Sequence, residues 1–270
     1  MKATALAVLA IGVWGNVARA VDVSACGQVV PAGEVGILVT SLDCSGVPGT
    51  DGVVLLNRAS LELRGNTIIS PSAGASVSCQ GARCAVSGPG FLLSVPFRGT
   101  GIAAAKSVTV SGNVEIAGHE VGIAAGEGQV TASDTFLSDN GDGIVARKVR
   151  GTNVFVRDSD RIGINAFKGI RGDHIEVRDN GTAGIYTARF TFTELIATTN
   201  GMTSTFLGGG IVATRRGRLT DSLVSGNTLL GAPADVVTGR SPILINTVCD
   251  ASVMLTDSGG SRTWGVCGLD

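Results

Sequence analysis

Apolar and polar positions repeat along the chain in a short unit between residues 101 and 227. Each unit opens with Gly-Ile and carries a small or apolar residue two places after the Ile. The opening glycines, 21, 21, 20, 21 and 26 residues apart, are Gly101, Gly122, Gly143, Gly163, Gly184 and Gly210. A fixed period near 20 residues is the signature of a solenoid, in which each repeat stacks on the next.

Within each unit, apolar residues alternate with polar ones at a period of two. Ile144 and Ala146 are two residues apart, as are Val154 and Val156. This period predicts β-strands, whereas a helical repeat would need apolar spacings of three and four. Strands of about four residues joined by Gly and Asn corners describe an all-β parallel β-helix of about 20–21 residues per coil, with coils about 4.8 Å apart. The residues predicted to stack inside one face are Ile102, Ile123, Ile144, Ile164, Ile185 and Ile211.

A polar column is expected at one corner of this solenoid. The units end on Asn113, Asn140, Ser159, Asn180, Asn200 and Asn227. Side-chain amides stacked at this corner would hydrogen-bond between coils and satisfy polar groups that a tight corner leaves unpaired.

These residues form a motif, Gly-Ile-x-Ala followed by Val-x-Val-x-x-Asn, seen for example at 153–158 and 174–180. The motif resembles that of the right-handed parallel β-helix repeat family, the pectin-lyase-like superfamily. The resemblance implies the right-handed form of the fold. Polygalacturonase-like members carry Asn-Thr-Asp, Asp-Asp, Gly-His-Gly and Arg-Ile-Lys, and none of these occurs here. The resemblance therefore assigns no catalytic residue, and fold alone does not supply function.

The chain is predicted to divide into a signal peptide at 1–20, an N-terminal cap at 21–51, the β-helix at 52–246 and a C-terminal cap at 247–270. The first segment fits a secretory signal: it has a basic start at Lys2, an apolar run from Ala3 to Val13 and a cleavage site at Ala18-Arg19-Ala20. A buried N-terminal strand or helix is the alternative. No later apolar run is long enough to span a membrane. The mature protein is therefore expected to be secreted to an extracellular, periplasmic or cell-surface location.

Six cysteines in an exported chain indicate disulfides. They form three couples close in sequence, Cys26 with Cys44, Cys79 with Cys84, and Cys249 with Cys267. Six cysteines allow fifteen connectivities. Local pairing is the hypothesis here, because a solenoid keeps sequence neighbours close in space.

The overall charge points to no partner. The chain has 21 Lys+Arg against 22 Asp+Glu, and without Lys2 and Arg19 the balance is 19 against 22. This balance predicts neither a positive electrostatic field that would attract nucleic acid nor a run of basic residues that would bind a membrane surface. Arg215-Arg216-Gly217-Arg218 is a local basic stretch that an anionic polymer could contact, but three charges are too few to define a site.

One group of polar residues is the best candidate for a site. The spacing of 21 residues stacks Arg-Asp pairs from consecutive coils beside the histidine of the same stretch. This charged patch consists of Arg157, Asp158, His174, Glu176, Arg178 and Asp179. Arg and carboxylate groups with an imidazole suit uronate chemistry. The favoured interpretation is nevertheless a solvated ladder of compensated charges, because functional patches are usually less regular than this one. His119-Glu120, expected in an exposed corner, is a second and lesser candidate.

Two functions from different classes remain open. The first is a secreted or cell-surface, carbohydrate-associated module that binds without catalysis or is structural. The second is a polysaccharide lyase, glycoside hydrolase or epimerase acting on uronate-type glycans. No cofactor is predicted, and a role for Ca²⁺ is considered only under the lyase alternative. The predicted partner is a polysaccharide or cell-surface glycan.

Overall fold

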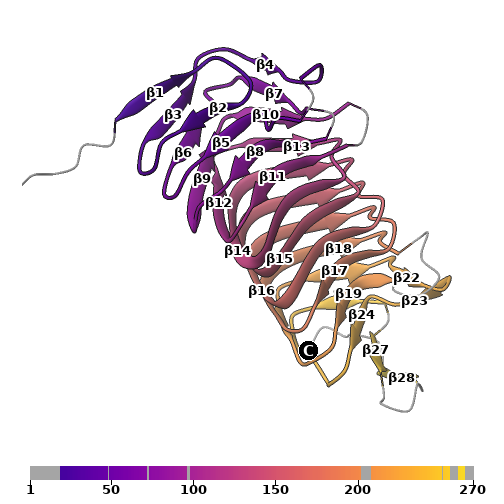
Figure 1. The fold of residues 1–270 in the computed structure, drawn as a ribbon. Coiled ribbons are helices and arrows are strands. Elements are labelled where there is room, and N and C mark those ends of the chain that lie inside the picture. The colour runs from indigo at the N-terminus through magenta and orange to yellow at the C-terminus, as the bar shows by residue number, and fades with distance from the viewer. Residues whose placement is uncertain are drawn as a thin grey trace, which may run out of the picture.

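A computed structural model describes residues 19–264 except 48, 72, 96–97, 202–207, 251 and 256–260, with side chains described up to residue 250. These residues form β-strands and no helix. Strand pairing is parallel throughout the stack, as Figure 1 shows, and three strand-lined faces follow one another in every coil. The predicted parallel β-helix is confirmed, and its architecture matches the right-handed form that the resemblance implies.

The first face carries the Gly-Ile motif. Its strands are β2 (Gln28–Val30), β5 (Val53–Leu55), β8 (Ala75–Cys79), β11 (Thr100–Ala104), the starts of β14 (Val121–Ser138), β15 (Asp142–Arg157) and β16 (Ile162–Arg178), then β17 (Ala183–Thr187), β19 (Gly209–Ala213), β24 (Val236–Thr238) and β27 (Ser252–Leu255).

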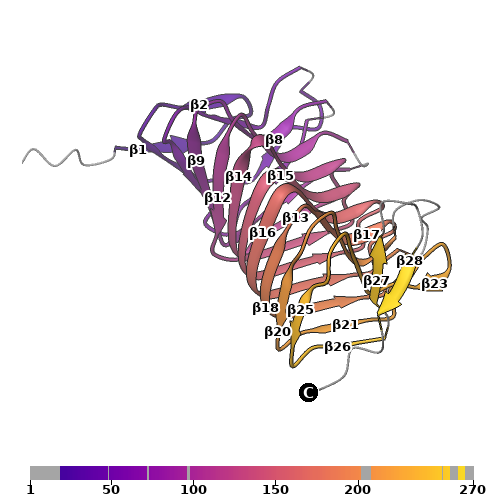
Figure 2. The same cartoon turned by 90° about the horizontal axis from the view of Figure 1, so that it is seen from below.

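The second face is reached after the next corner. Its strands are β1 (Ala20–Val23), β3 (Val35–Leu38), β6 (Ser60–Glu62), β9 (Arg83–Ser87), β12 (Ser107–Ser111), the middle parts of β14, β15 and β16, the start of β18 (Phe190–Thr198), β20 (Arg218–Thr220) and β25 (Ile243–Ile245). Figure 2 shows β12, β14, β15, β16, β18, β20 and β25 in order along the stack.

The third face completes each coil. Its strands are β4 (Leu42–Asp43), β7 (Thr67–Ile69), β10 (Gly90–Leu93), β13 (Val114–Ala117), the ends of β14, β15, β16 and β18, then β21 (Leu223–Ser225) and β26 (Val248–Cys249). Outside the parallel stack lie the antiparallel pair β22 (Thr228–Leu229) and β23 (Ala232–Pro233), and β28 (Ser261–Trp264), which pairs antiparallel with β27.

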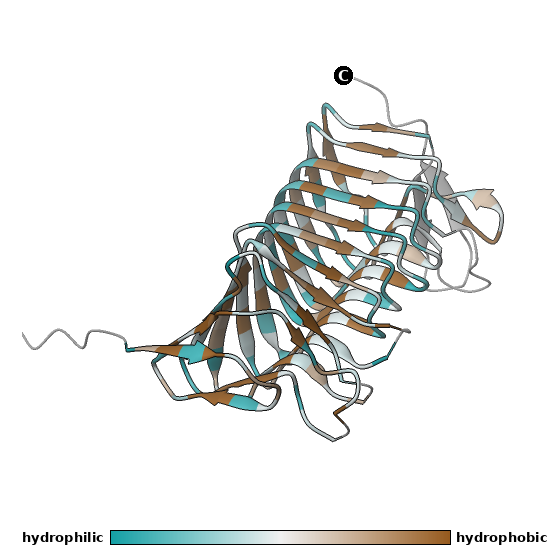
Figure 3. Ribbon diagram, turned by 90° about the horizontal axis from the view of Figure 1, so that it is seen from above, coloured by the Kyte–Doolittle hydropathy of each residue, from teal (hydrophilic) through white to brown (hydrophobic). Residues whose placement is uncertain are grey.

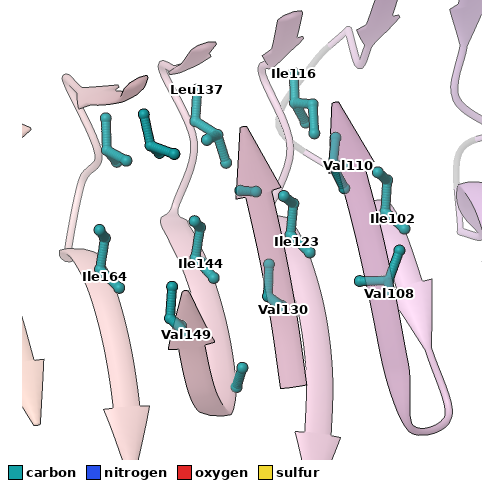
Figure 4. Packing of buried hydrophobic residues seen from close by; sticks show 14 of the residues in the cluster. Ile102, Val108, Val110, Ile116, Ile123, Val130, Leu137, Ile144, Val149 and Ile164 are labelled. Atoms are coloured by element: carbon teal, nitrogen blue, oxygen red, sulfur yellow. The ribbon is translucent and has the colours of Figure 1, made fainter. Parts of the chain in front are cut away.

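The inside of the solenoid is a dry core of stacked aliphatic side chains. Ile102, Ile123 and Ile144 are direct pairing partners in successive coils, and each is fully buried. Figure 4 shows these residues in a row with Ile164. The predicted inward residues Ile144, Ala146, Val154 and Val156 are all buried, so the inward register is confirmed. In Figure 3 the apolar segments run along the strands, while hydrophilic residues concentrate at the corners.

The predicted polar column is present, with one correction. Asn180 Nδ2 donates to Asn200 Oδ1 at 2.8 Å, and Asn200 Nδ2 donates to Asn227 Oδ1 at 2.8 Å. Ser159 holds its place in the column and donates its backbone N–H to Asn180 Oδ1 at 3.1 Å. Asn113, however, is exposed at the corner between the second and third faces, with φ of 62°. The prediction for Asn113 is therefore wrong.

His119 occupies the column position expected for Asn113, and it is fully buried rather than exposed. Its backbone N–H donates to Asn140 Oδ1 at 3.0 Å, as other members of the column do to their neighbours. Its Nε2 lies 3.1 Å from the Leu92 carbonyl, which can only accept, so Nε2 carries the hydrogen. His119 is thus a core residue, so the expectation of an exposed His119 is wrong, whereas Glu120 beside it is exposed.

The two ends of the chain concern the predicted cap, disulfides and signal peptide. The segment predicted as an N-terminal cap contains β1 to β4, which already pair in parallel with later strands. Disulfides join Cys26 to Cys44 and Cys79 to Cys84, as predicted. Cys249 is disulfide-bonded too, and its predicted partner, Cys267, lies outside the described residues. Nearly all of the predicted signal peptide also lies outside them.

Candidate functional site

The charged patch predicted from the sequence is brought together by the pairing of β15 with β16. Arg157 and Arg178 are direct partners on neighbouring coils. Each of these cations has a compensating contact: Arg178 Nε lies 2.7 Å from Glu176 Oε1, and Arg157 Nε lies 3.6 Å from Asp158 Oδ2. The Arg157 guanidinium also lies 4.7 Å from the centre of the Phe136 ring, a cation–π contact. These charges largely satisfy one another.

The carboxylates and the histidine of the charged patch point to other partners. Asp179 accepts a hydrogen bond from the Thr199 hydroxyl. Burial raises the pKa of Asp158, the carboxylates of Asp139 and Asp179 raise it further, and Arg157 opposes the shift. His174 Nδ1 lies 3.2 Å from Asp173 Oδ2, and its Nε2 contacts Glu194. His174 is therefore held by two carboxylates that the sequence prediction did not include.

A second cluster, consisting of cations alone, lies on the second face and at the corner before it. We call it the basic surface, and its eight exposed members are Lys148, Arg150, Lys168, Arg171, Arg189, Arg215, Arg216 and Arg218. They come from four consecutive coils: two lie in β15, two in β16, one just before β18, and three just before and in β20. Only stacking of the coils gathers them on one side of the molecule.

Strand register sets the spacing of the basic surface. Arg150 and Arg171 are direct partners in the pairing of β15 with β16. Lys148 pairs with Gly169, so a residue without a side chain leaves space between the cations of neighbouring coils. A hollow of about 260 Å³ forms there. Its titratable lining side chains are all cationic: Lys148, Arg150, Lys168, Arg171 and Arg189.

The last coil of the basic surface contains a glycine, Gly217, directly before Arg218. A Cβ at Gly217 would lie 2.2 Å from carbons of the Phe190 ring, so only glycine fits against this buried aromatic side chain. Arg218, the next residue, pairs through β20 with Thr191 of β18. The stretch Arg215-Arg216-Gly217-Arg218, too short to define a site in the sequence, is therefore the end of a larger cationic array.

No member of the basic surface forms an ion pair within the described residues. Like charges placed side by side on neighbouring strands destabilise a sheet. Arg150 and Arg171 are such a pair, whereas Arg157 and Arg178, in the same two strands, each have a compensating partner. The repulsion between Arg150 and Arg171 is therefore not compensated by an ion pair among the described residues.

A row of hydroxyl groups borders these cations on the second face. A hollow of about 400 Å³ lies over this face. Beside Arg150 and Arg171 it is lined by Thr131, Ser133, Thr152, Thr191 and Thr193, together with Asp173. Hydroxyls both donate and accept hydrogen bonds, so the second face combines fixed cations with neutral hydrogen-bonding groups.

The described residues contain no group of three His, Cys, Asp or Glu side chains arranged to hold a metal ion. They also contain no helix long and apolar enough to cross a bilayer.

The sequence matches no protein-family model and no curated protein. Among solved structures, the chain is similar to the crystal structure of pectate lyase Pel9A, with a TM-score of 0.43 and 14% sequence identity, over 80% of this chain and 72% of that chain. At this level of similarity, the function has to come from the chain's own residues.

Proposed function

We propose that this chain is an exported glycan-binding module that holds an acidic polysaccharide along its basic surface. The observation that carries the proposal is the array of eight exposed cations that lack an acidic partner among the described residues. The array follows the solenoid axis over four coils, with neighbouring strands about 4.8 Å apart. A linear polyanion lying along the axis would meet a cation on each of these coils.

The chemistry of the second face favours a polysaccharide among polyanions. Arginine forms paired hydrogen bonds with carboxylate or sulfate groups, and the neighbouring Thr and Ser hydroxyls can bond to sugar hydroxyls. Single-stranded nucleic acid is usually held by exposed aromatic side chains on which bases stack. Phe190 is the one aromatic residue lining the two hollows, and it is 2% exposed. The two hollows therefore lack a stacking platform, and the exposed ring of Phe167, beside Lys168, lines neither of them.

Two features support an exported location. The predicted signal peptide directs the chain out of the cytoplasm. The disulfides Cys26–Cys44 and Cys79–Cys84 are typical of proteins that fold in an oxidising compartment.

Binding without turnover is the function that the surroundings of the basic surface favour. A lyase, hydrolase or epimerase needs a positioned acid or base within hydrogen-bond reach of the sugar. Among the residues lining the two hollows, Asp173 is the one acid, and it contacts His174. The enzymatic alternative remains testable in the same sample, because a lyase would release an unsaturated uronate that absorbs ultraviolet light.

Retention on immobilised polygalacturonate at low ionic strength tests this function. We expect retention that weakens steeply as NaCl is raised, because salt screens exposed charges. We also expect no ultraviolet-absorbing product after long incubation with the soluble polymer. Absence of retention at low salt, or retention that NaCl does not reduce, would contradict the proposal, and a released unsaturated product would replace it with a lyase activity.

A further inference from the structure

The third face carries a long groove that the basic surface does not use. Two hollows, of about 680 Å³ and about 490 Å³, lie over the outside of this face. They share Asn153 and Phe155 and therefore adjoin each other. We call them together the third-face groove. It runs along the solenoid axis from β13 to β21, with Asn113 lining one end and Asn246 the other.

One wall of the third-face groove is a row of polar corner residues. Each has a left-handed backbone, with φ between 47° and 62°, which turns the chain sharply from the second face to the third. The row consists of Asn113, Asp134, Asn153, His174, Glu194, Asp221 and Asn246. Asn, Asp and His adopt this conformation more readily than other non-glycine residues, whereas it is uncommon for Glu.

Hydrogen bonds between coils fix this polar wall. Asn153 Nδ2 donates to Asp134 Oδ1 at 2.9 Å, and Asn246 Nδ2 donates to Asp221 Oδ1 at 3.0 Å. His174 and Glu194 are in contact in the same way between these two pairs. Each pair spans two neighbouring coils and holds its oxygen and nitrogen atoms in fixed orientations. Ligand binding therefore causes little further loss of side-chain conformational entropy.

The floor of the third-face groove is largely apolar. Phe136 and Phe155 are pairing partners in β14 and β15, with ring centres 6.4 Å apart. Ile196 and Leu223 continue the same row after Glu176. Phe155 is 41% exposed and Leu223 is 39% exposed, an amount of exposed apolar surface that a ligand could cover.

The charges at the groove exclude anionic ligands. No Lys or Arg lines either hollow, while carboxylates do. Two of these carboxylates already have cationic or imidazole partners, Glu176 with Arg178 and Glu194 with His174. The other carboxylates of the groove, Glu115, Asp134 and Asp221, have no cationic partner among the described residues. The groove therefore offers hydrogen-bond acceptors and carries negative charge, which disfavours anionic ligands.

We propose that the third-face groove binds a neutral linear polysaccharide. A sugar ring has an apolar C–H face and a rim of hydroxyl donors, which match the aromatic floor and the acceptor-rich wall. A linear polymer of similar units suits a groove in which each coil repeats a polar corner and an adjoining floor residue. This site is separate from the basic surface, and its proposed ligand carries no charge, unlike the acidic polymer proposed for the basic surface.

The test measures affinity for hexamers of neutral glycans, comprising β-1,4-glucan, β-1,4-xylan, β-1,4-mannan, β-1,3-glucan and α-1,4-glucan. We expect the wild-type chain to bind at least one of them, with little effect of NaCl. Phe155→Ala should weaken that binding at least tenfold, because it removes the centre of the floor. Phe91→Ala is the matched control: Phe91 is also 41% exposed on the third face but does not line the groove. The affinity of Phe91→Ala for the hexamers should equal the wild-type value.

A second substitution tests the polar wall separately from the apolar floor. Glu194→Gln retains the size of the side chain and removes its charge, and it should also weaken binding if the polar wall contacts sugar hydroxyls. Failure to bind any of the five hexamers, equal affinities of Phe155→Ala and wild type, or binding of a deca-lysine peptide in their place would each overturn the proposal. None of these results would touch the polygalacturonate test, so the two proposals fail separately.

Discussion

At the scale of single residues, His119 shows how the polar column accepts a different side chain. It provides the backbone donor to Asn140 that an asparagine would provide, while its ring reaches the Leu92 carbonyl and the Ser70 hydroxyl, whose Oγ lies 3.4 Å from Nδ1. Burial lowers the pKa of His119 to about 4, and the hydrogen bond to Leu92 opposes this shift. A buried neutral imidazole couples folding to pH.

The sign of that coupling follows from the two states. The ordinary histidine pKa is 6.5, so between about pH 6.5 and pH 4 the unfolded chain binds a proton that the folded chain does not. The stability contributed by neutral His119 is fully present above this window and is lost as the pH falls through it. We expect the loss from pH 7 to pH 4 to reach about 3 kcal/mol.

His119→Asn tests this contribution, because Asn is the residue that the column uses in other coils. Urea unfolding at pH 7 and pH 4 should show a steeper loss of stability for wild type than for the variant, by about 3 kcal/mol. All carboxylates are shared by the two proteins, so their titration cancels in the difference. Identical pH dependence would show that His119 does not titrate as its burial requires.

At the scale of the strand, alternation with a period of two was enough to predict the core. Ile144 and Ala146, and Val154 and Val156, point inward as predicted because a strand places every second side chain on the same side. The same rule caused the error at Asn113. The Val108-x-Val110 pair that precedes it belongs to the second face, while Val114-x-Ile116, before His119, belongs to the third. Strands of both faces alternate alike, so pattern alone cannot tell which corner follows.

Ile164→Asp is predicted to disrupt the solenoid. Ile164 is 1% exposed, stacked between Ile144 and Ile185, and a carboxylate there would have no partner. The expected cost is on the order of 4 kcal/mol. The matched control is Phe167→Asp in the same strand, where the side chain is 50% exposed and the expected change is within about 0.5 kcal/mol. Thermal unfolding measures both, and an unchanged melting temperature for Ile164→Asp would show that the inward register is wrong.

At the scale of the whole molecule, charge is polarised although the totals nearly cancel. The chain has 21 Lys+Arg and 22 Asp+Glu, yet eight cations gather on the second face and its preceding corner. The sequence could not show this directly, because the cations lie in four segments that become neighbours only when the coils stack. Arg150 and Arg171 are 21 residues apart, so alignment of the repeats is the signal that could have found them.

The charged patch shows the other limit of sequence reasoning. The repeat correctly placed Arg157 beside Arg178, but the compensating contacts of these side chains depend on rotamers and on which acids lie at the next position. The repeat period predicts which residues become neighbours. It does not predict which of those neighbours form ion pairs or hydrogen bonds with one another.

The disulfides bear on the compartment as well as on the fold. Cys26–Cys44 and Cys79–Cys84 lie in the first coils, and Cys249 is disulfide-bonded near the other end. Thiol titration of the exported protein in denaturant should therefore find no free thiol. Free thiols in the exported protein would contradict both the predicted pairing and the inference of an oxidising compartment.

The most direct test of the account compares two pairs of arginines in the same two strands. The double variant Arg150→Gln with Arg171→Gln removes two uncompensated cations, and Arg157→Gln with Arg178→Gln removes two compensated ones. Affinity for polygalacturonate at low salt is measured for both. We expect the first variant to bind at least tenfold more weakly than wild type, a loss of about 1.4 kcal/mol, and the second to bind like wild type. Equal effects of the two variants, or wild-type affinity in the first, would contradict the assignment of the basic surface as the polymer-binding site.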